Sequence, residues 1–197
     1  MTLDPNNLVQ WQVKDPISGI PMPWYTHTCL AWLKAQDWHD TIVLEWGGGW
    51  SSVWWASNCK ELHTIEANPD WHEGVRERLV EWPNASIELR QINEGDQSRV
   101  DEYTNIGESK PDVFIVDGIL RYECIVAAIK NLKDRSGVII VDNWQQAGVF
   151  MCPSAEDILR PFGRKIFEQH NHTDNDGVNK WKTAVFFINN VDLLWKI

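Results

Sequence analysis

IVLEWGGGWSS, at residues 42–52, joins an apolar run to the acid Glu45 and to three consecutive glycines. A short segment that can form a helix follows, and a second apolar run, LHTIE at residues 62–66, ends in the acid Glu66. This order predicts a strand, a glycine turn, a helix and a second strand. Glycine lets the backbone approach a ligand closely because it has no Cβ. A carboxylate about 20 residues further on can accept hydrogen bonds from ribose hydroxyls. The stretch therefore predicts a site for a ligand that contains a ribose.

The residues around the turn discriminate between nucleotide ligands. Dinucleotide-binding folds commonly carry a G-x-G-x-x-G turn, and the following helix N-terminus binds a pyrophosphate. In this chain Ser52 takes the third glycine position, and Glu45 stands two residues before the first glycine. A carboxylate there would repel a pyrophosphate and attract the ammonium group of an amino acid. These features favour S-adenosylmethionine, which has a ribose, an adenine and a methionine end but no phosphate. The alternative is a structural strand–helix turn in which the glycines serve packing alone.

The composition is consistent with an intracellular globular enzyme. The 197 residues are expected to form one domain, 1–197, with residues 1–22 as an irregular lead-in. The net charge of -10 argues against nonspecific binding to nucleic acid, which needs clustered Lys and Arg. No apolar run approaches the ~20 residues that span a bilayer, so no membrane partner is expected. The cysteines form no C-x-x-C pair and are interpreted as reduced thiols, which predicts a cytoplasmic location. They are Cys29, Cys59, Cys124 and Cys152. None of these features indicates the oligomeric state.

Apolar runs and helical patterns alternate along the chain. Strands are expected at about 41–46, 62–66, 87–92, 113–116 and 138–141, and helices at about 25–35, 51–57, 69–80 and 121–132. The runs VFIV and VIIV are short and continuously apolar, as in parallel strands that are buried on both faces. Residues 165–169 and 183–188 are expected to form an antiparallel hairpin. The sequence thus predicts an α/β fold, with a doubly wound, mostly parallel sheet, a C-terminal antiparallel hairpin and helices on both faces.

Five polar residues stand at or just after the ends of these strands. Ligands of open α/β sheets bind beyond the carboxyl ends of the strands, so these side chains are expected at one edge of the sheet. The alternative is that they terminate strands and cap helices, which accounts well for one or two of them. The residues are Glu45, Glu66, Asp117, Asp142 and Asn143.

Three segments of the chain resemble class I S-adenosylmethionine-dependent methyltransferases, which have a Rossmann-like sheet. The segments are VLEWGGGWSSVWWA (43–56), LHTIEANPDWHEGVRERL (62–79) and PDVFIVDGILRYECIVAAIKNLKDRSGVIIVDNW (111–144). The likeness runs from about Pro23 to the C-terminus and looks closest to small enzymes with E-x-G-x-G-x-S, V-D-G-x-x-R and V-D-N segments. Gly48 stands where Ser is common and Ser52 where Thr is common, and neither change removes a group that the site needs.

The resemblance implies how the matching residues bind the cofactor, S-adenosylmethionine. Glu66 would bind the ribose hydroxyls, and Ala67 would lie beside the adenine. Glu94 and Asp96 would contact the adenine amine, and Asp117 would lie near the sulfonium and the acceptor. The residues of the turn would line the methionine moiety: Glu45, Gly47, Gly48, Gly49 and Ser51.

The resemblance also implies a small-molecule methyl acceptor, with oxygen as the expected acceptor atom and with Asp117 and Arg121 as candidate catalytic residues. Asp117, Asp142 and Asn143 are similar to the two Asp and one Asn that bind Mg²⁺ in catechol-type O-methyltransferases, and oxygen ligands suit Mg²⁺. Such a metal could lower the pKa of an acceptor hydroxyl. The lysine that those enzymes use as a base has no match, because Leu120 and Arg121 occupy that region. A Mg²⁺ site is therefore one alternative, and strand-end caps or acceptor contacts are the other.

Several functional alternatives stay open. Arg121 could bind an acidic acceptor or pair with a carboxylate at the sheet edge, and His27 could act as a general base. Trp50 and Trp71 are close enough in the sequence to the turn to contact an adenine. An NAD-linked Rossmann oxidoreductase and a non-catalytic S-adenosylmethionine-binding module are the competing functions.

Overall fold

A seven-stranded sheet forms the centre of the protein in a computed structural model that describes residues 19–92, 97–146, 155–170 and 180–189. The strand order is β3-β2-β1-β4-β5-β7-β6. The strands are β1 (Ile42–Trp46), β2 (Glu61–Glu66), β3 (Ala85–Leu89), β4 (Val113–Val116), β5 (Gly137–Val141), β6 (Gly163–His170) and β7 (Lys180–Ile188). The helices are α1 (His27–Lys34), α2 (Trp50–Asn58), α3 (Pro69–Leu79), α4 (Val100–Thr104), α5 (Arg121–Asn131) and α6 (Ala155–Leu159), with short 3₁₀ turns η2 (Gln97–Arg99) and η3 (Trp144–Gln146).

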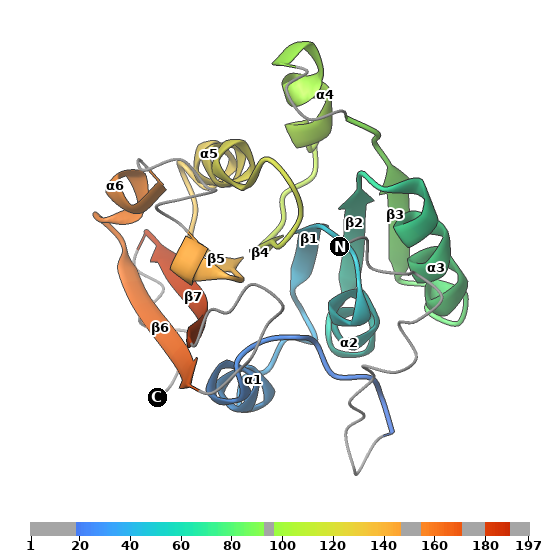
Figure 1. Cartoon of the computed structure of the whole chain (residues 1–197), viewed down its shortest axis with the longest axis horizontal. Coiled ribbons are helices and arrows are strands. Elements are labelled where there is room, and N and C mark those ends of the chain that lie inside the picture. Colours follow the sequence, from blue (N-terminus) through green and yellow to red (C-terminus); the bar gives the residue numbers. More distant parts are fainter. Residues whose placement is uncertain (1–18, 93–96, 147–154, 171–179, 190–197) are drawn as a thin grey trace.

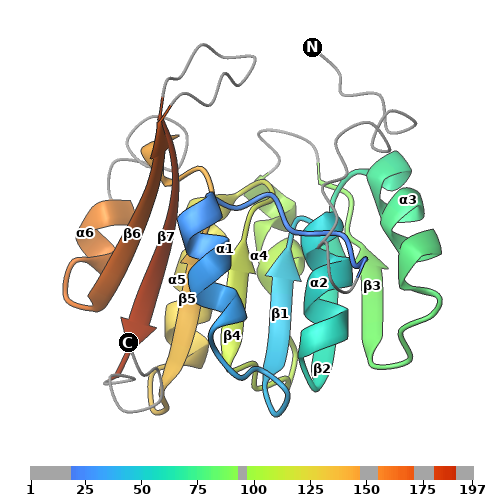
Figure 2. The ribbon, with the colours of Figure 1, turned by 90° about the horizontal axis from the view of Figure 1, so that it is seen from below.

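Strands β1 to β5 are parallel, and β7 pairs antiparallel with both β5 and β6. This arrangement confirms the predicted fold class, a mostly parallel sheet with a C-terminal antiparallel pair. All residues of β4 and β5 are buried, as their continuous apolar runs predicted. The carboxyl ends of the parallel strands meet at the upper edge of the sheet in Figure 2.

Helices cover both faces of the sheet (Figure 1) and enclose two hydrophobic clusters. Side chains of α1, α2 and α3 contribute to one cluster, and those of α4, α5 and α6 to the other. Tryptophans fill much of the first cluster: the rings of Trp38 and Trp55 meet edge to face at 5.0 Å, and Trp54 meets Trp55 at 4.9 Å. Large aromatic side chains supply much apolar area for burial, so the tryptophans at these positions serve the core.

Several predicted boundaries differ from the observed ones. Strand β3 begins two residues before the predicted start at 87 and ends at Leu89, because it is the edge strand and its side chains are largely exposed. Helix α4 forms in the polar stretch 93–108, where no regular element was expected. Strand β7 begins at Lys180 rather than at 183. Residues 1–18 of the predicted lead-in lie outside the described residues. None of the helices in the described part of the chain has the length and apolar character that a membrane span requires.

The turn after β1 and the turn after β4 touch through their backbones. Gly47 has a φ of 90°, and a Cβ on it would lie 2.4 Å from the backbone nitrogen of Gly118. The Gly118 N–H and the Asp117 N–H both donate to the carbonyl of Trp46, at 2.8 and 2.9 Å. The Gly47 N–H donates in turn to the carbonyl of Ile65 at the end of β2 (2.9 Å). The ends of β2, β1 and β4 are thus linked by backbone hydrogen bonds with no room for a side chain at Gly47.

The Gly47→Ala variant is expected to lose at least about 2 kcal/mol of unfolding free energy, because a strained φ and a steric clash act together. Urea unfolding would measure this loss. Gly49→Ala is the matched control, since the nearest described atom to an added Cβ there is the Ser51 hydroxyl oxygen, at 3.8 Å. An equal effect of the two substitutions would contradict the close contact between the turns.

Candidate functional site

Glu45 lies beneath the glycine turn with a fully buried carboxylate. One of its oxygens accepts a hydrogen bond from the Ser51 hydroxyl (2.5 Å). The other oxygen accepts from the hydroxyls of Ser52 (2.5 Å) and Thr64 (3.0 Å). These donors come from the first turn of α2 and from β2. The carboxylate therefore joins β1, α2 and β2 under the turn.

Burial raises the pKa of Glu45 to about 7, against the lowering effect of the three hydroxyl donors. Ser52 also accepts a hydrogen bond from the Gly49 N–H at 3.0 Å. The serine in the third glycine position thus holds both the turn and the buried carboxylate. The resemblance implied that Glu45 lines the methionine moiety, and the structure places its carboxylate below the turn, against hydroxyl groups.

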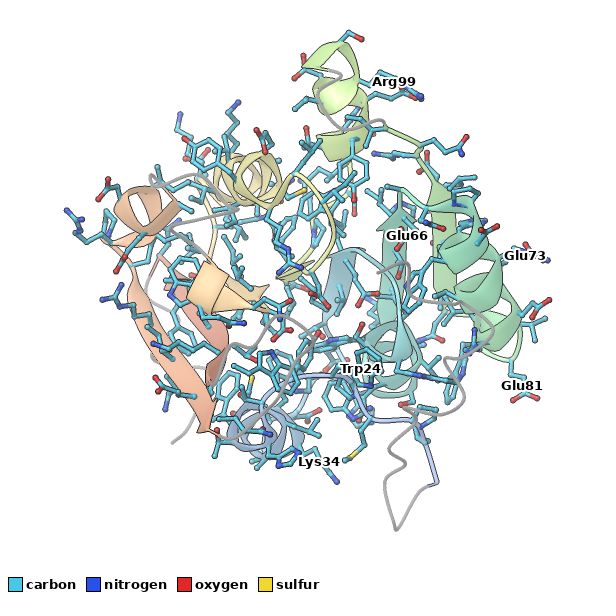
Figure 3. All side chains as sticks on the ribbon, in the orientation of Figure 1. Trp24, Lys34, Glu66, Glu73, Glu81 and Arg99 are labelled. Atoms are coloured by element: carbon cyan, nitrogen blue, oxygen red, sulfur yellow. The ribbon has the colours of Figure 1, made fainter. Side chains whose placement is uncertain are left out.

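Glu66 ends β2 beside the turn, and its carboxylate is held by backbone donors. One oxygen accepts from the N–H of Gly48 (2.9 Å), and the other accepts from the N–H groups of Ala67 and Asn68 (both 2.8 Å). Burial raises the pKa of Glu66, while these N–H groups lower it. Figure 3 shows Glu66 directed inward between β2 and α3, whereas Glu73 points outward from α3. The structure therefore brings Glu66 and the glycine turn together. Glu94 and Asp96 lie outside the described residues.

Two tryptophans cover the outer side of the turn. The Trp71 indole N–H donates to the carbonyl of Gly48, and the guanidinium of Arg78 lies 4.6 Å from the ring centre of Trp50. Together with Gly49 and Val75, these three side chains line a small crevice. Both tryptophans lie next to the turn, as expected, and they line its outer side.

Arg121, at the start of α5, links the ends of β4 and β5. Its guanidinium donates to the carbonyls of Asp117 (2.7 Å), Gly118 (2.8 Å) and Asp142 (2.6 Å). It also donates to the Asp117 carboxylate (3.1 Å) and to the side-chain oxygen of Asn143 (3.3 Å). The planar guanidinium can serve this many acceptors at once, which an ammonium group cannot. The structure therefore favours the prediction that Arg121 pairs with the sheet edge.

The two aspartates after β4 and β5 differ in exposure. The side chain of Asp117 is 28% exposed, and burial raises its pKa to about 6 although Arg121 lowers it. Asp142 is 3% exposed, and burial raises its pKa well above the ordinary value. The Asp142 carboxylate accepts hydrogen bonds from the Trp181 indole N–H, at 3.1 and 3.2 Å, and from the Thr183 hydroxyl, at 2.7 Å.

The residues proposed as Mg²⁺ ligands do not fit that ion. Both carboxylate oxygens of Asp142 receive the Trp181 N–H, and the side-chain oxygen of Asn143 receives the guanidinium of Arg121. That guanidinium also contacts the Asp117 carboxylate, so a fixed positive charge stands where the cation would bind. Within the described ranges, no group of three or more His, Cys, Asp and Glu side chains could hold a metal.

Two tyrosines that the sequence did not single out as catalytic lie at the site. The Tyr103 hydroxyl is buried without a hydrogen-bond partner in the part of the chain that the structure describes, and it lies 3.0 Å from the position of a Cβ on Gly118. The Tyr25 hydroxyl accepts from the Trp55 indole N–H (3.4 Å), and burial and then the charge of Glu45 raise its pKa. The place of Tyr25 beside the first predicted helix could have pointed to it from the sequence. The polar stretch around Tyr103 has no pattern that could have pointed to that residue. His27 is exposed.

The stability of the protein is expected to fall as the pH rises from about 5 to about 8, and Glu45→Gln should reduce this slope. Glu45 has a folded pKa of about 7 against an ordinary 4.5, so the folded chain binds the proton more tightly. Its contribution is therefore complete below the ordinary pKa and is lost as the pH rises through the folded value. Urea unfolding at several pH values measures the slope, with the exposed Glu81→Gln as control. Equal slopes for Glu45→Gln and the wild type would refute this assignment.

Arg121→Lys is expected to cost about 1–3 kcal/mol of unfolding free energy, because an ammonium group cannot serve the acceptors on both strand ends. Arg160→Lys is the control, since the ion pair of Arg160 with Asp157 is exposed. Thermal or urea unfolding of both variants tests the role. A loss no larger than that of the control would show that Arg121 does not link the strands.

Comparisons with known proteins agree with the fold. No protein-family model matches the sequence, and no curated protein matches it. The N-methyltransferase NodS from Bradyrhizobium japonicum WM9, in complex with S-adenosyl-L-homocysteine, is 15% identical with a TM-score of 0.57, over 76% of this chain and 78% of that chain. The O-methyltransferase TomG from Streptomyces achromogenes, in complex with S-adenosylmethionine, is 19% identical with a TM-score of 0.53, over 80% and 76%. Precorrin-6y C5,15-methyltransferase from Geobacter metallireducens GS-15 is 18% identical with a TM-score of 0.54, over 81% and 84%. This chain thus has a Rossmann-like fold that is similar to the folds of class I S-adenosylmethionine-dependent methyltransferases.

Proposed function

We propose that the protein is an S-adenosylmethionine-dependent methyltransferase that acts on a small-molecule acceptor. The observation that carries this proposal is the position of Glu66, whose carboxylate lies 2.9 Å from the backbone nitrogen of Gly48 at the glycine turn. The oxygen that accepts from Gly48 has no other donor among the described residues, so it can accept a further hydrogen bond from a ribose hydroxyl. Glu45 beneath the turn disfavours a phosphate at the start of α2, so a nucleoside without phosphate fits better than a dinucleotide.

The residues around the turn fit such a cofactor. Among the residues that the structure describes, a Cβ on Gly49 would meet the Ser51 hydroxyl alone, at 3.8 Å, so these residues leave room for a ligand beside the backbone. We assign Gly47, Gly48, Gly49 and Ser51 to the methionine moiety. Ala67 directly follows Glu66 and would lie beside the adenine.

The chemistry that the cofactor supplies is a methyl group activated on a sulfonium. The protein has to align the acceptor with that methyl group and to exclude water. Asp117, whose side chain is partly exposed after β4, is the carboxylate best placed to contact the acceptor. Arg121 fixes Asp117 by donating to both its carbonyl and its carboxylate. Arg121 thus acts as a positioning residue in this proposal.

The identity of the acceptor atom depends on whether the site can activate a hydroxyl group. The resemblance favoured oxygen, through a metal that would lower the pKa of a hydroxyl. Metal-assisted methylation of a hydroxyl loses support, because Asp117, Asp142 and Asn143 do not fit Mg²⁺. In addition, Leu120 and Arg121 stand where the related enzymes have a lysine. The described cysteines Cys29, Cys59 and Cys124 are buried free thiols, which suits the proposed cytoplasmic location.

Calorimetric titration with S-adenosylmethionine, S-adenosylhomocysteine and NAD⁺ tests the proposal. Both adenosyl ligands are expected to bind and NAD⁺ is not. Glu66→Ala should weaken adenosyl binding by roughly 1–3 kcal/mol, because hydrogen bonds to a charged group are lost. Glu66→Gln keeps an oxygen that can accept from the backbone N–H groups, so it is a second variant that tests the loss of charge with less risk of misfolding. Glu73→Ala, an exposed acid on α3, is the control.

The outcomes separate the three candidate functions. Binding of NAD⁺ without the adenosyl ligands would establish the oxidoreductase alternative. Adenosyl binding without methyl transfer to any small amine or hydroxyl compound would favour the non-catalytic binding module. Unchanged affinity in both Glu66 variants would remove the ribose assignment.

A further inference from the structure

Asp117 and Asp142 lie side by side on one face of the sheet. Val116 and Val141 are paired in the parallel register of β4 and β5, and the Asp142 N–H donates to the Val116 carbonyl (3.2 Å). The two aspartates are the next residues on each strand. Since side chains alternate between faces, they project to the same side as Ile115, which packs in the cluster under α1 and α2. The register therefore creates a pair of neighbouring carboxylates at the carboxyl edge.

The negative charge of this pair is only partly compensated. Arg121 contacts the carboxylate of Asp117, but it reaches Asp142 only through the backbone carbonyl. The donors to the Asp142 carboxylate, Trp181 and Thr183, are neutral groups. Glu45 adds a third carboxylate on the same face, because it pairs with Ile115 in the register of β1 and β4. This edge therefore favours a ligand that brings positive charge.

Two buried polar groups without partners among the described residues belong to Thr26, which contacts Thr183, and to Gln145, which contacts the neighbouring Lys182. The Thr26 N–H donates to the Thr183 hydroxyl (3.1 Å), whereas the buried hydroxyl of Thr26 has no partner among the residues that the structure describes. Gln145 accepts from the Lys182 N–H (2.8 Å), and its side-chain nitrogen is likewise buried without a partner in the described ranges. Buried polar groups are normally hydrogen-bonded, so the Thr26 hydroxyl can accept a hydrogen bond from an ammonium group, whereas the Gln145 side-chain nitrogen is a donor and would pair with an acceptor.

Aromatic side chains accompany the carboxylates. Tyr25 lies close enough to Glu45, Asp117 and Asp142 for all three charges to raise the pKa of its hydroxyl, after the larger effect of burial. Trp181 contacts Asp142 directly, and Trp24, which is 39% exposed, directly precedes Tyr25. Aromatic rings attract cations through their faces, so they add to the preference set by the carboxylates.

We propose that the methyl acceptor is an amine that carries a positive charge in solution and binds against the Asp117–Asp142 pair. This inference rests on the proposed methyltransferase function and names the substrate class of the same site. The ammonium N–H groups would donate to the Asp117 carboxylate, which is the more exposed of the two. An acidic acceptor would be repelled, and a neutral alcohol would gain no charge pairing.

The transfer to nitrogen balances without a further reactant. The bound ammonium group gives one proton to the Asp117 carboxylate, which frees the nitrogen lone pair. The nitrogen–methyl bond forms as the bond between the methyl group and sulfur breaks, and S-adenosylhomocysteine leaves with a neutral sulfur. The proton then passes from Asp117 to solvent.

Calorimetry on the complex of the full chain with S-adenosylhomocysteine tests the proposal with three probes of one skeleton: 2-phenylethylamine, 2-phenylethanol and phenylacetate. The amine is expected to bind at least about tenfold more tightly than the alcohol at neutral pH, and phenylacetate more weakly than either. Asp117→Asn, which keeps an oxygen for Arg121, should remove the preference for the amine. Asp134→Asn, an exposed acid at the opposite edge of the sheet, should keep it.

The comparison among the probes on the wild-type protein does not depend on the folding of any variant. Binding of the alcohol or of phenylacetate as tightly as the amine would overturn the proposal, and so would the absence of amine binding. A preference for the amine that survives Asp117→Asn would overturn it as well. In each of these cases, binding of S-adenosylhomocysteine would leave the proposed cofactor site intact, whereas failure of that ligand to bind would remove the proposed function itself.

Discussion

The buried carboxylate of Glu45 is the constraint on which the candidate site depends. It accepts hydrogen bonds from Ser51, Ser52 and Thr64, so it fixes the start of α2 and the end of β2 against β1. A carboxylate buried without such donors would be strongly destabilising, and each hydroxyl would be unsatisfied without the carboxylate. The glycine turn above this cluster is held in one shape, and Glu66 can bridge from β2 to the turn.

The same face of the sheet carries more negative charge than its neighbours compensate. Glu45 lies within β1, and Asp117 and Asp142 follow β4 and β5, all on the side covered by α1 and α2. Arg121 directly contacts the carboxylate of Asp117 alone among these three. Burial raises the pKa of all three. The negative charge of these carboxylates would stabilise both a bound sulfonium and a cationic acceptor. The same groups therefore account for the proposed cofactor site and for the proposed amine site.

Much of the fold was predictable because its signals are local. The runs at 113–116 and 138–141 are continuously apolar, which requires strands buried on both faces, and the glycines at 47–49 require a turn where a side chain cannot fit at the first position. The edge strand β3 and the short helix α4 were placed less well, because few of their residues are buried and the apolar pattern is weak. The acids at strand ends were found from the sequence, although what each carboxylate contacts was not.

The sequence by itself determined which residues would meet at the carboxyl edge, since parallel strands with acids at their ends must bring those acids together. Only the tertiary structure decided their roles. The register of β4 and β5 makes Asp117 and Asp142 neighbours, and the antiparallel β7 brings Trp181 and Thr183 to Asp142 from about 40 residues away along the chain. Those donors, together with Arg121, occupy the oxygens that a metal ion would need. Such contacts depend on pairing between distant segments, and no local pattern of residues encodes that pairing.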